Sequence, residues 1–304
     1  MTFTAKDVAD LRQKTGAGMM ECKKALTDAN GDIEKASEIL RQKGIVAAAK
    51  KADKVAMEGI VASKISDDKK SGVIIELSAQ TDFVAKNELF IDLSHKILDA
   101  ALSSKSKSLE DLLQVKVDGS PLSELIKSRI STIGENIQLR RVNVFQLDKG
   151  VIGTYIHPVG NKIGVLVKLE SSSDSNKSDL DELSKNIAMH IAASQPQPDF
   201  INKSEIPANI IEEEKRIEMG KEDLAKKPKE IAEKIVQGRL DKLLAQRCLL
   251  EQPFIKDPGL TVEKMVLEKG KQLNIEIKVA QFIRYNVGET QDKSQLEEKE
   301  PAAV

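Results

Sequence analysis

The stretch Thr81-Asp82-Phe83-Val84-Ala85-Lys86-Asn87 joins two segments of opposite pattern. Before it, the apolar run Gly72-Val73-Ile74-Ile75-Glu76-Leu77 predicts a buried strand. After it, apolar residues recur at steps of three and four, as on one face of a helix: Phe90, Leu93, Ile97 and Ala101. The quoted stretch is therefore expected to form a strand-to-helix corner.

Within this corner, three neighbouring residues have distinct expected roles. Thr81 is a good N-cap, because its hydroxyl can accept a hydrogen bond from the first helical turn. Asp82 then lies at the positive end of the helix dipole, which favours a carboxylate. Phe83 has two interpretations: it folds back onto the helix as a hydrophobic staple, or it forms with Asp82 a probe that another protein receives.

The composition narrows the class of protein. The chain has 304 residues, 31% of them charged, with a net charge of -1, which disfavours binding to a polyanion by bulk charge. No apolar run is long enough to span a bilayer, and the first residues lack the apolar core of a signal peptide. The two cysteines, Cys22 and Cys248, lie far apart in sequence, which fits a reducing cytoplasm.

An α+β fold is expected, beginning with a small helical bundle over residues 4–41. Gly16-Ala17-Gly18 ends its first helix, Asn30-Gly31 makes a turn, and Asp32 caps its third helix. The bundle resembles the ubiquitin-associated (UBA-like) type, whose first loop is a common binding edge. Met19 and Met20 beside that loop suit an adaptable apolar contact, or one of them belongs to the core. Residues 43–54 form a charged connector that is expected to be helical.

A β-β-α order then occurs twice. Strands are predicted at 60–65 and 73–77, followed by the helix after Thr81 and a second helix with Ser120 as N-cap, Pro121 in its first turn and Gly134 at its end. The second occurrence has strands at 151–156 and 163–169 and a helix that ends before Pro196. We interpret this as an internal structural repeat. A short helix at 262–267 and a strand at 275–283 complete the second half.

Residues 204–250 have the pattern of a protruding antiparallel coiled-coil hairpin. Its apolar positions are Ile210, Ile217 and Leu224, then Ile231, Ile235, Leu240, Leu243 and Leu244. The basic tip at Lys226-Lys227-Pro228 is either a solvated surface or a contact with another molecule. The expected domains are 1–54 (helical module and connector), 55–140 (first core subdomain), 141–203 with 252–290 (second core subdomain), 204–251 (hairpin) and 291–304 (disordered tail).

Sequence motifs of catalysis are absent. The chain contains no phosphate-binding loop, dinucleotide fingerprint, nucleophile elbow or HExxH metal motif, and no Cys/His cluster suggests zinc. His190 borders the apolar face of its helix, where a satisfied histidine at the edge of the core is the simplest interpretation. A binding protein is therefore favoured over an enzyme, and we predict no catalytic residue, no metal and no cofactor.

Several long motifs resemble bacterial elongation factor Ts. They are residues 11–26, the corner segment Gln80–Asn87, the segment Met189–Ser194, residues 227–239 and residues 282–289. The resemblance covers essentially the whole chain and departs at Asn87, where the family often has an acidic residue. It implies a cytoplasmic guanine nucleotide exchange factor that binds elongation factor Tu in its GDP-bound and nucleotide-free forms.

The resemblance also implies site residues. Thr81, Asp82, Phe83 and Val84 would disturb the partner's magnesium site. Further contacts would come from Arg12, Met19, Met20, His157, Gly160, Ile163, Gly164 and His190. Neither a membrane nor DNA is an expected partner, whereas tRNA-bearing complexes are a possible weak contact of the hairpin. Two other classes remain open: an adaptor that captures unrelated peptides, and a ribosome- or RNA-associated protein with strongly salt-dependent binding.

Overall fold

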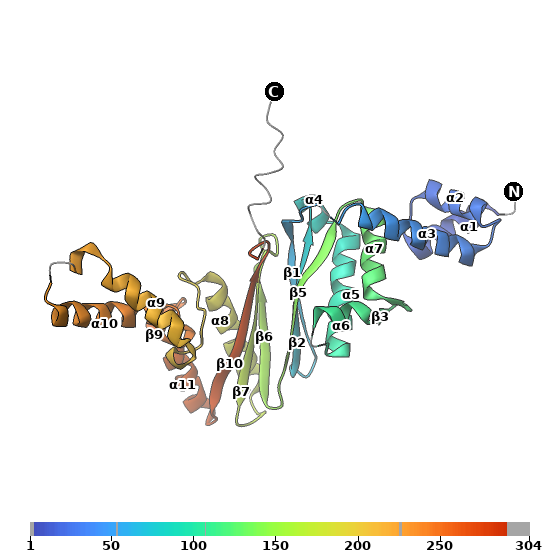
Figure 1. Cartoon of the computed structure of the whole chain (residues 1–304). Helices are drawn as coiled ribbons and strands as arrows, with labels where there is room; N and C mark the ends of the chain where they lie inside the picture. The colour runs from blue at the N-terminus through green and yellow to red at the C-terminus, as the bar shows by residue number, and fades with distance from the viewer. Residues whose placement is uncertain (1–2, 53, 107, 225–226, 291–304) are drawn as a thin grey trace.

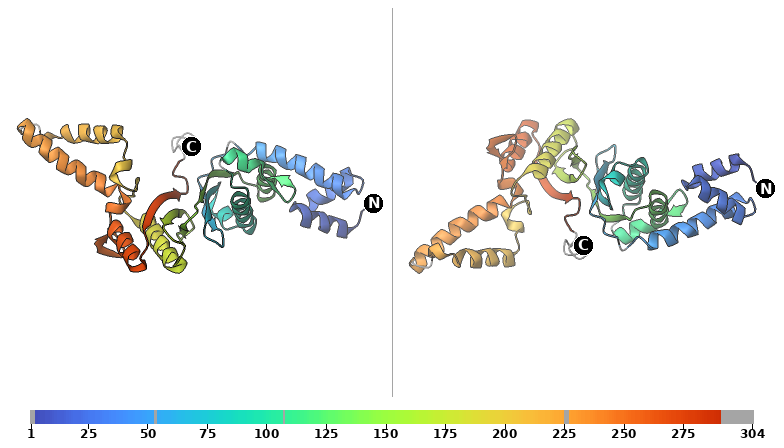
Figure 2. Two further views of the ribbon diagram at one scale, coloured as in Figure 1. Left: turned by 90° about the horizontal axis from the view of Figure 1, so that it is seen from below. Right: turned by 90° about the horizontal axis from the view of Figure 1, so that it is seen from above.

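The computed structural model describes residues 3–52, 54–106, 108–224 and 227–290. The fold is mixed α+β, with two three-stranded antiparallel sheets at the centre. A helical module lies at one end of the elongated molecule and a pair of helices at the other (Figures 1 and 2). The tail predicted at 291–304, and Lys226 of the predicted tip, lie outside the described residues.

The three predicted helices of the N-terminal module are confirmed as α1 (Ala5–Thr15), α2 (Met19–Asp28) and α3 (Ile33–Ala49). Gly16 ends α1 in the left-handed conformation at φ 71°, and the Asp32 side chain accepts from the Lys35 N–H to begin α3. The predicted helical connector is helical only as far as Ala49, where α3 ends, and residues 50–52 form a turn. The C-terminal part of α3 packs along α7 (Leu122–Ile133) of the core.

The first sheet consists of β1 (Glu58–Ile65), β2 (Ser71–Ala79) and β5 (Ile137–Gln146), with β2 in the middle. The hairpin β1–β2 is as predicted, but β5 is an additional strand. Its pairing with β2 shifts register between Glu76 and Leu77. Such a bulge interrupts the period-two alternation of apolar residues, which explains why the sequence pattern did not indicate this strand.

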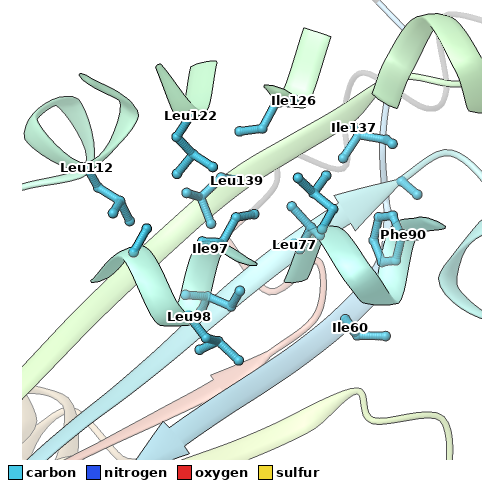
Figure 3. Close-up of a cluster of buried hydrophobic side chains, with 14 of the residues drawn as sticks. Ile60, Leu77, Phe90, Ile97, Leu98, Leu112, Leu122, Ile126, Ile137 and Leu139 are labelled. Carbon is cyan, nitrogen blue, oxygen red and sulfur yellow. The ribbon is translucent and has the colours of Figure 1, made fainter. Parts of the chain in front are cut away.

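Helices α5 (Glu88–Ser104), α6 (Leu109–Gln114) and α7 cover the outer face of this sheet. Phe90, Ile97 and Leu77 meet in the cluster between them (Figure 3). Burial of each such side chain contributes roughly 1.5–3 kcal/mol. An exposed pair such as Lys64–Asp99 contributes about 0–1 kcal/mol, so the apolar cluster fixes the helices.

The predicted start of α7 is wrong. Ser120 does not cap the helix but lies with Pro121 in β4 (Ser120–Pro121), which pairs with β3 (Lys116–Val117). Asp118 and Gly119 both have positive φ, so they close a two-residue turn that draws Ser120 into the strand pair. The helix therefore begins at Leu122, with Pro121 as a cap that makes no side-chain hydrogen bond.

The second sheet consists of β6 (Gly150–Ile156), β7 (Ile163–Ser171) and β10 (Ile277–Asn286), with β7 in the middle. Helices α8 (Lys177–Ala193) and α11 (Val262–Leu273) pack on its outer face. The strands at β6 and β7 and the end of α8 before Pro196 are as predicted. The helix predicted at 262–267 continues to Leu273, which moves the final strand from 275–283 to Ile277–Asn286.

Helices α9 (Ala208–Met219) and α10 (Lys229–Gln246) form the pair at the far end. Two of the predicted apolar-stripe positions are wrong, because Ile217 is 52% exposed and Ile231 is 51% exposed. The predicted positions Leu240 and Leu244 are buried, and the buried stripe of α10 is completed by Ala232 and Val236. It begins one residue after Ile231 and then advances in steps of four, so Ile231 falls outside it.

Short elements join these parts. The 3-10 turns are η1 (Lys203–Glu205), η2 (Glu222–Leu224) and η3 (Leu249–Glu251). After η3, the small hairpin of β8 (Pro253–Phe254) and β9 (Asp257–Thr261) leads into α11. The chain thus returns from the helix pair to the sheet that it left.

The inner faces of the two sheets press against each other. Val61 and Ile74 of the first sheet are buried with Ile152 and Leu166 of the second. Gly72 permits this approach, since a Cβ there would lie 2.6 Å from Ile152 Cγ2.

At the rim of this contact, the fully buried Glu76 carboxylate accepts from Arg141 Nε at 2.6 Å and from the Gly288 N–H at 2.9 Å. The Arg141 guanidinium also donates to the Asn286 carbonyl at 3.1 Å and stacks on the Tyr285 ring. A buried ion pair thus fastens the end of β10 to the first sheet.

Replacing Gly72 with valine is expected to lower the free energy of unfolding by about 1–3 kcal/mol, because overpacking must separate the sheets or distort side chains. The control is Gly238→Ala in α10, where the added Cβ meets nothing within 4 Å. That substitution should stabilise by about 0.5–1 kcal/mol through helix propensity. Urea unfolding measures both, and an unchanged midpoint for Gly72→Val would show that the sheets are not tightly apposed.

Candidate functional site

The corner forms a short helix of its own, α4 (Asp82–Ala85). The Thr81 hydroxyl accepts from the Val84 N–H at 3.4 Å, as predicted for an N-cap. Val84 is buried in the core of the first sheet, whereas Phe83 is 79% exposed. The staple interpretation of Phe83 is therefore wrong, because a staple would be covered by the helix that it folds onto.

The single helix predicted after Thr81 is broken at Lys86 and Asn87. The Asn87 side chain accepts from the Leu89 N–H at 2.9 Å and begins α5. Asparagine is among the best N-cap residues, so capping of α5 explains the asparagine at position 87. The break leaves α4 as a separate turn at one end of the first sheet (Figure 1).

Asp82 faces solvent beside Phe83. Its carboxylate accepts from Lys86 Nζ at 3.0 Å. This hydrogen bond, with the positive charges of Lys86 and Lys162 nearby, lowers the pKa of Asp82 below its ordinary value. The corner therefore presents a negative charge next to an aromatic ring at neutral pH, a pair that can meet a cationic or metal-bearing surface and an apolar pocket together.

The β6–β7 loop, residues 157–162, lies at the same end of the sheets as the corner. Its Asn161 carbonyl accepts from the Val61 N–H at 2.7 Å, and its Lys162 carbonyl accepts from the Val287 N–H at 2.9 Å. Lys162 also pairs with Glu58 at 2.6 Å. The loop is thus tied to both sheets.

The predicted site residues of this loop differ in accessibility. His157 is partly buried beside Tyr155, whose hydroxyl lies 3.3 Å from Nδ1. Gly160 is exposed with φ 71°, next to Val159, which is 74% exposed. Ile163 is partly buried. Gly164 is buried, and a Cβ there would lie 2.4 Å from Val61 Cγ1. The tip of the loop is therefore accessible at Val159 and Gly160, whereas Gly164 serves the contact between the sheets.

The N-terminal module exposes a second apolar point. Met20 is 75% exposed and Met19 48% exposed, so neither is a core residue of the bundle. Arg12 is also exposed, on the neighbouring helix α1. Because Gly18 precedes α2, both methionines project from the first turn of that helix. The alternative that one methionine belongs to the core is wrong.

His190 is only 2% exposed, and its ring has internal partners on both nitrogens. Nδ1 accepts from the Ile255 N–H at 3.2 Å, so Nε2 carries the proton in the neutral ring and lies 2.9 Å from Gln252 Oε1. Burial lowers the pKa of His190 below its ordinary value. The geometry agrees with the predicted histidine at the edge of the core. Because the ring is buried, it could affect partner binding only indirectly, by positioning the residues to which it is hydrogen-bonded.

Sequence reasoning missed the residues that hold the corner from behind. The Glu135 carboxylate accepts from both the N–H and the hydroxyl of Thr81, at 3.0 and 2.8 Å. Asn136, next to it, is buried and bonds to the connector and to Gln80. These residues follow Gly134, which was interpreted only as a helix end. The sequence signal that could have indicated this role is the pair of polar residues, Glu135 and Asn136, directly after the glycine that ends the helix.

The site thus consists of separated apolar points with adjacent charge, namely the module, the corner and the loop. Within the described ranges, no group of three His, Cys, Asp or Glu side chains could hold a metal ion. Over the same residues, no helix is both long and apolar enough to cross a membrane. Exposed apolar side chains held on ordered elements are typical of surfaces that bind another macromolecule.

Comparison with known proteins identifies the family. The model of the family described as Elongation factor TS matches residues 80–289. The elongation factor Ts of Syntrophotalea carbinolica is 44% identical over 295 residues, which cover 96% of this chain and 95% of that protein. Those of Clostridium botulinum and Nostoc punctiforme are also 44% identical, over 96% and 97% of this chain and 95% of each relative. The chain belongs to the elongation factor Ts family.

Burial of His190 has a consequence for stability. Because its folded pKa is lowered, the unfolded chain binds a proton more readily, and stability should fall as pH drops below about 6.5. The contribution is limited to about 1.4 kcal/mol per pH unit and levels off below the folded pKa.

Urea unfolding between pH 8 and 5 measures this slope. His190→Gln should have a shallower dependence than the wild-type protein, and His95→Gln, at an exposed position of α5, is the control for removal of a histidine outside the core. Equal slopes for wild type and His190→Gln would contradict a neutral buried ring.

Proposed function

We propose that this chain releases GDP from elongation factor Tu by inserting the Asp82–Phe83 corner beside the magnesium site of that GTPase. The family is one of nucleotide exchange factors for elongation factor Tu and acts without catalytic chemistry of its own. The observation that carries the proposal is the 79% exposure of Phe83 on a turn whose neighbours Thr81 and Val84 are fixed. Because the turn is fixed, insertion of Phe83 can favour a changed conformation of the partner. On a loose loop, the aromatic side chain would move aside and leave the partner unchanged.

The energetics require more than one contact. A GTPase holds its nucleotide through the phosphates and a bridging magnesium ion, and nanomolar binding corresponds to about 12 kcal/mol. Coupling between two sites typically amounts to about 1–3 kcal/mol. One contact is therefore too weak to speed release by many decades, and several must favour the same partner conformation in which nucleotide binding is poor.

We assign those contacts to the points that the fold separates. Phe83 would wedge between packed helices of the partner, and Asp82 would disturb its magnesium coordination, with Thr81 and Val84 holding the turn. Arg12, Met19 and Met20 would bind through the module, and His157 and Gly160 through the loop, which Ile163 and Gly164 support. His190 would act through Ile255, whose N–H it binds and whose side chain is 45% exposed.

The finer architecture is part of the same proposal. The sheet orders β1-β2-β5 and β6-β7-β10 are equivalent, each with the second strand in the middle, which supports two related core subdomains. We divide the chain into a UBA-like module with its connector (1–54), two core subdomains, an inserted coiled-coil hairpin at 204–251, and a tail at 291–304. The boundary expected at 140 falls inside β5, whose residues as far as Gln146 pair with β2. We therefore propose core subdomains at 55–146 and at 147–203 with 252–290. Family membership places the protein in the cytoplasm, where translation elongation occurs.

The hairpin offers a further contact, with tRNA-bearing complexes of the partner. Lys227 and Lys229 are exposed at the tip. Reversing both charges, Lys227→Glu with Lys229→Glu, should slow turnover of the aminoacyl-tRNA complex severalfold at low salt, since exposed charges act over a short screened range. Stopped-flow fluorescence measures this step. A rate equal to wild type at low ionic strength would exclude the tip from this role.

Phe83→Ala should lower GDP release from elongation factor Tu by about tenfold or more, equivalent to about 1.4 kcal/mol of barrier, while the fold stays intact. Stopped-flow release of labelled GDP measures the rate and circular dichroism the fold. The matched control is Leu267→Ala, which removes an exposed apolar side chain from α11, a helix outside the assigned contacts.

Wild-type rates for Phe83→Ala would refute the wedge. Absence of accelerated GDP release by the unmodified protein would favour the adaptor alternative.

A further inference from the structure

Three consecutive residues, Gly134, Glu135 and Asn136, lie between α7 and β5 and bind two segments that are far apart in sequence. We name them the 134–136 turn. On one side they hold the end of the connector: Lys51 Nζ donates to the Gly134 carbonyl, and Asn136 Nδ2 donates to the carbonyls of Ala52 and Lys54 at 3.2 and 2.7 Å.

On its other side, the 134–136 turn holds the start of the corner. The Glu135 carboxylate accepts two hydrogen bonds from Thr81, and the Asn136 N–H donates to Gln80 Oε1 at 3.3 Å. Because the Thr81 hydroxyl gives its only proton to Glu135, its lone pair is left to accept from the Val84 N–H. The carboxylate thus orients the N-cap of the helix that carries Phe83.

Asn136 suits this position for a chemical reason. Its side chain is buried, at 1% exposure, and both of its amide protons go to backbone carbonyls. An aspartate would place a negative charge against two carbonyl oxygens, and an aliphatic side chain would leave both oxygens without these donors. The amide is therefore specific to the junction between connector and corner.

The connector leads directly to the module. It continues α3, which contacts α7 through the Arg41–Glu124 ion pair at 2.5 Å and through close packing of Gly44 on Ser131. The module is consequently held at two places, along α7 and at the 134–136 turn. The second place is the one that it shares with the corner.

We propose that Glu135 and Asn136 are positioning residues that set the corner relative to the N-terminal module, so that elongation factor Tu meets both contacts at once. The inference rests on the proposed function. Two contacts on one rigid body reinforce each other, because engagement of the first raises the effective concentration of the second. A loosened junction would leave each contact intact and lose their joint action.

The first test is structural and needs no partner. Nitroxide labels at Gln13→Cys in the module and Lys86→Cys at the corner report the distance between them, while the native Cys22 and Cys248 are both buried. We expect a narrow distance distribution in the otherwise unchanged chain and a broad one with Asn136→Ala. Ile187→Val, a core substitution in α8, which packs on the second sheet, controls for general destabilisation and should keep the distribution narrow. An unbroadened distribution with Asn136→Ala overturns the inference.

The second test measures joint action in GDP release from elongation factor Tu. Met20→Ala and Asn136→Ala should each lower kcat/KM by about fivefold, within the range of couplings found for interacting sites. The double variant should be no slower than the slower single variant, because either change already abolishes the cooperation. In the control background Ile187→Val, Met20→Ala should still lower kcat/KM by about fivefold. If the double variant Met20→Ala with Asn136→Ala loses kcat/KM by the product of the two single losses, the inference is overturned.

If Asn136→Ala fails to fold, Glu135→Gln at a partly exposed position serves in both tests. Its amide keeps one acceptor oxygen and replaces the other with an NH2 donor, so it cannot accept from both the N–H and the hydroxyl of Thr81. A broadened distance distribution with unimpaired exchange also overturns the inference. Failure of the proposed function is recognised separately, by wild-type GDP release from Phe83→Ala.

Discussion

The close contact between the two sheets is the constraint on which the rest of the molecule depends. Each sheet carries its helices on the outer face, so the inner faces have only each other to cover their apolar side chains. Glycine at positions 72 and 164 brings the backbones near enough for Val61, Ile152 and Leu166 to interlock. The relative position of everything attached to the two sheets follows from this contact.

Hydrogen bonds between polar groups at the rim of that contact fix the position of one sheet relative to the other. Glu76 is buried and would be destabilising alone, but it binds Arg141 and the Gly288 N–H together. This fastens β10 to the first sheet, and residues next to it hold the β6–β7 loop through Val287 and Lys162. The loop and the corner therefore belong to one body even though they come from different sheets.

The sequence indicated the parts whose signals are local. Gly16 and Asp32 delimit helices through their own backbone preferences, and Thr81 caps α4 as its side chain predicts. The strand β5 was missed because its register shift opposite Glu76 hides the alternation, and Ser120 was misassigned because a two-residue turn drew it into a strand. Ile217 and Ile231 were assigned to a buried stripe, but the partner helix does not cover them. Local pattern cannot show which helix face a partner covers.

The candidate site also contains residues that local sequence indicates and residues whose role depends on distant parts of the chain. The sequence context drew attention to Asp82 and Phe83, because an aromatic residue beside an acid at a helix start is conspicuous in a chain with few aromatics. That context left the staple and the probe open, and only the family resemblance favoured the probe. Glu135 and Asn136 were not indicated by the sequence, because their importance comes from groups about 55 and 82–84 positions away. An exchange factor that acts by contact alone needs both kinds of residue: some to touch the partner, and others to hold those at a fixed separation. Since each contact supplies only a small coupling free energy, the separation decides whether the couplings act on one partner conformation and accumulate.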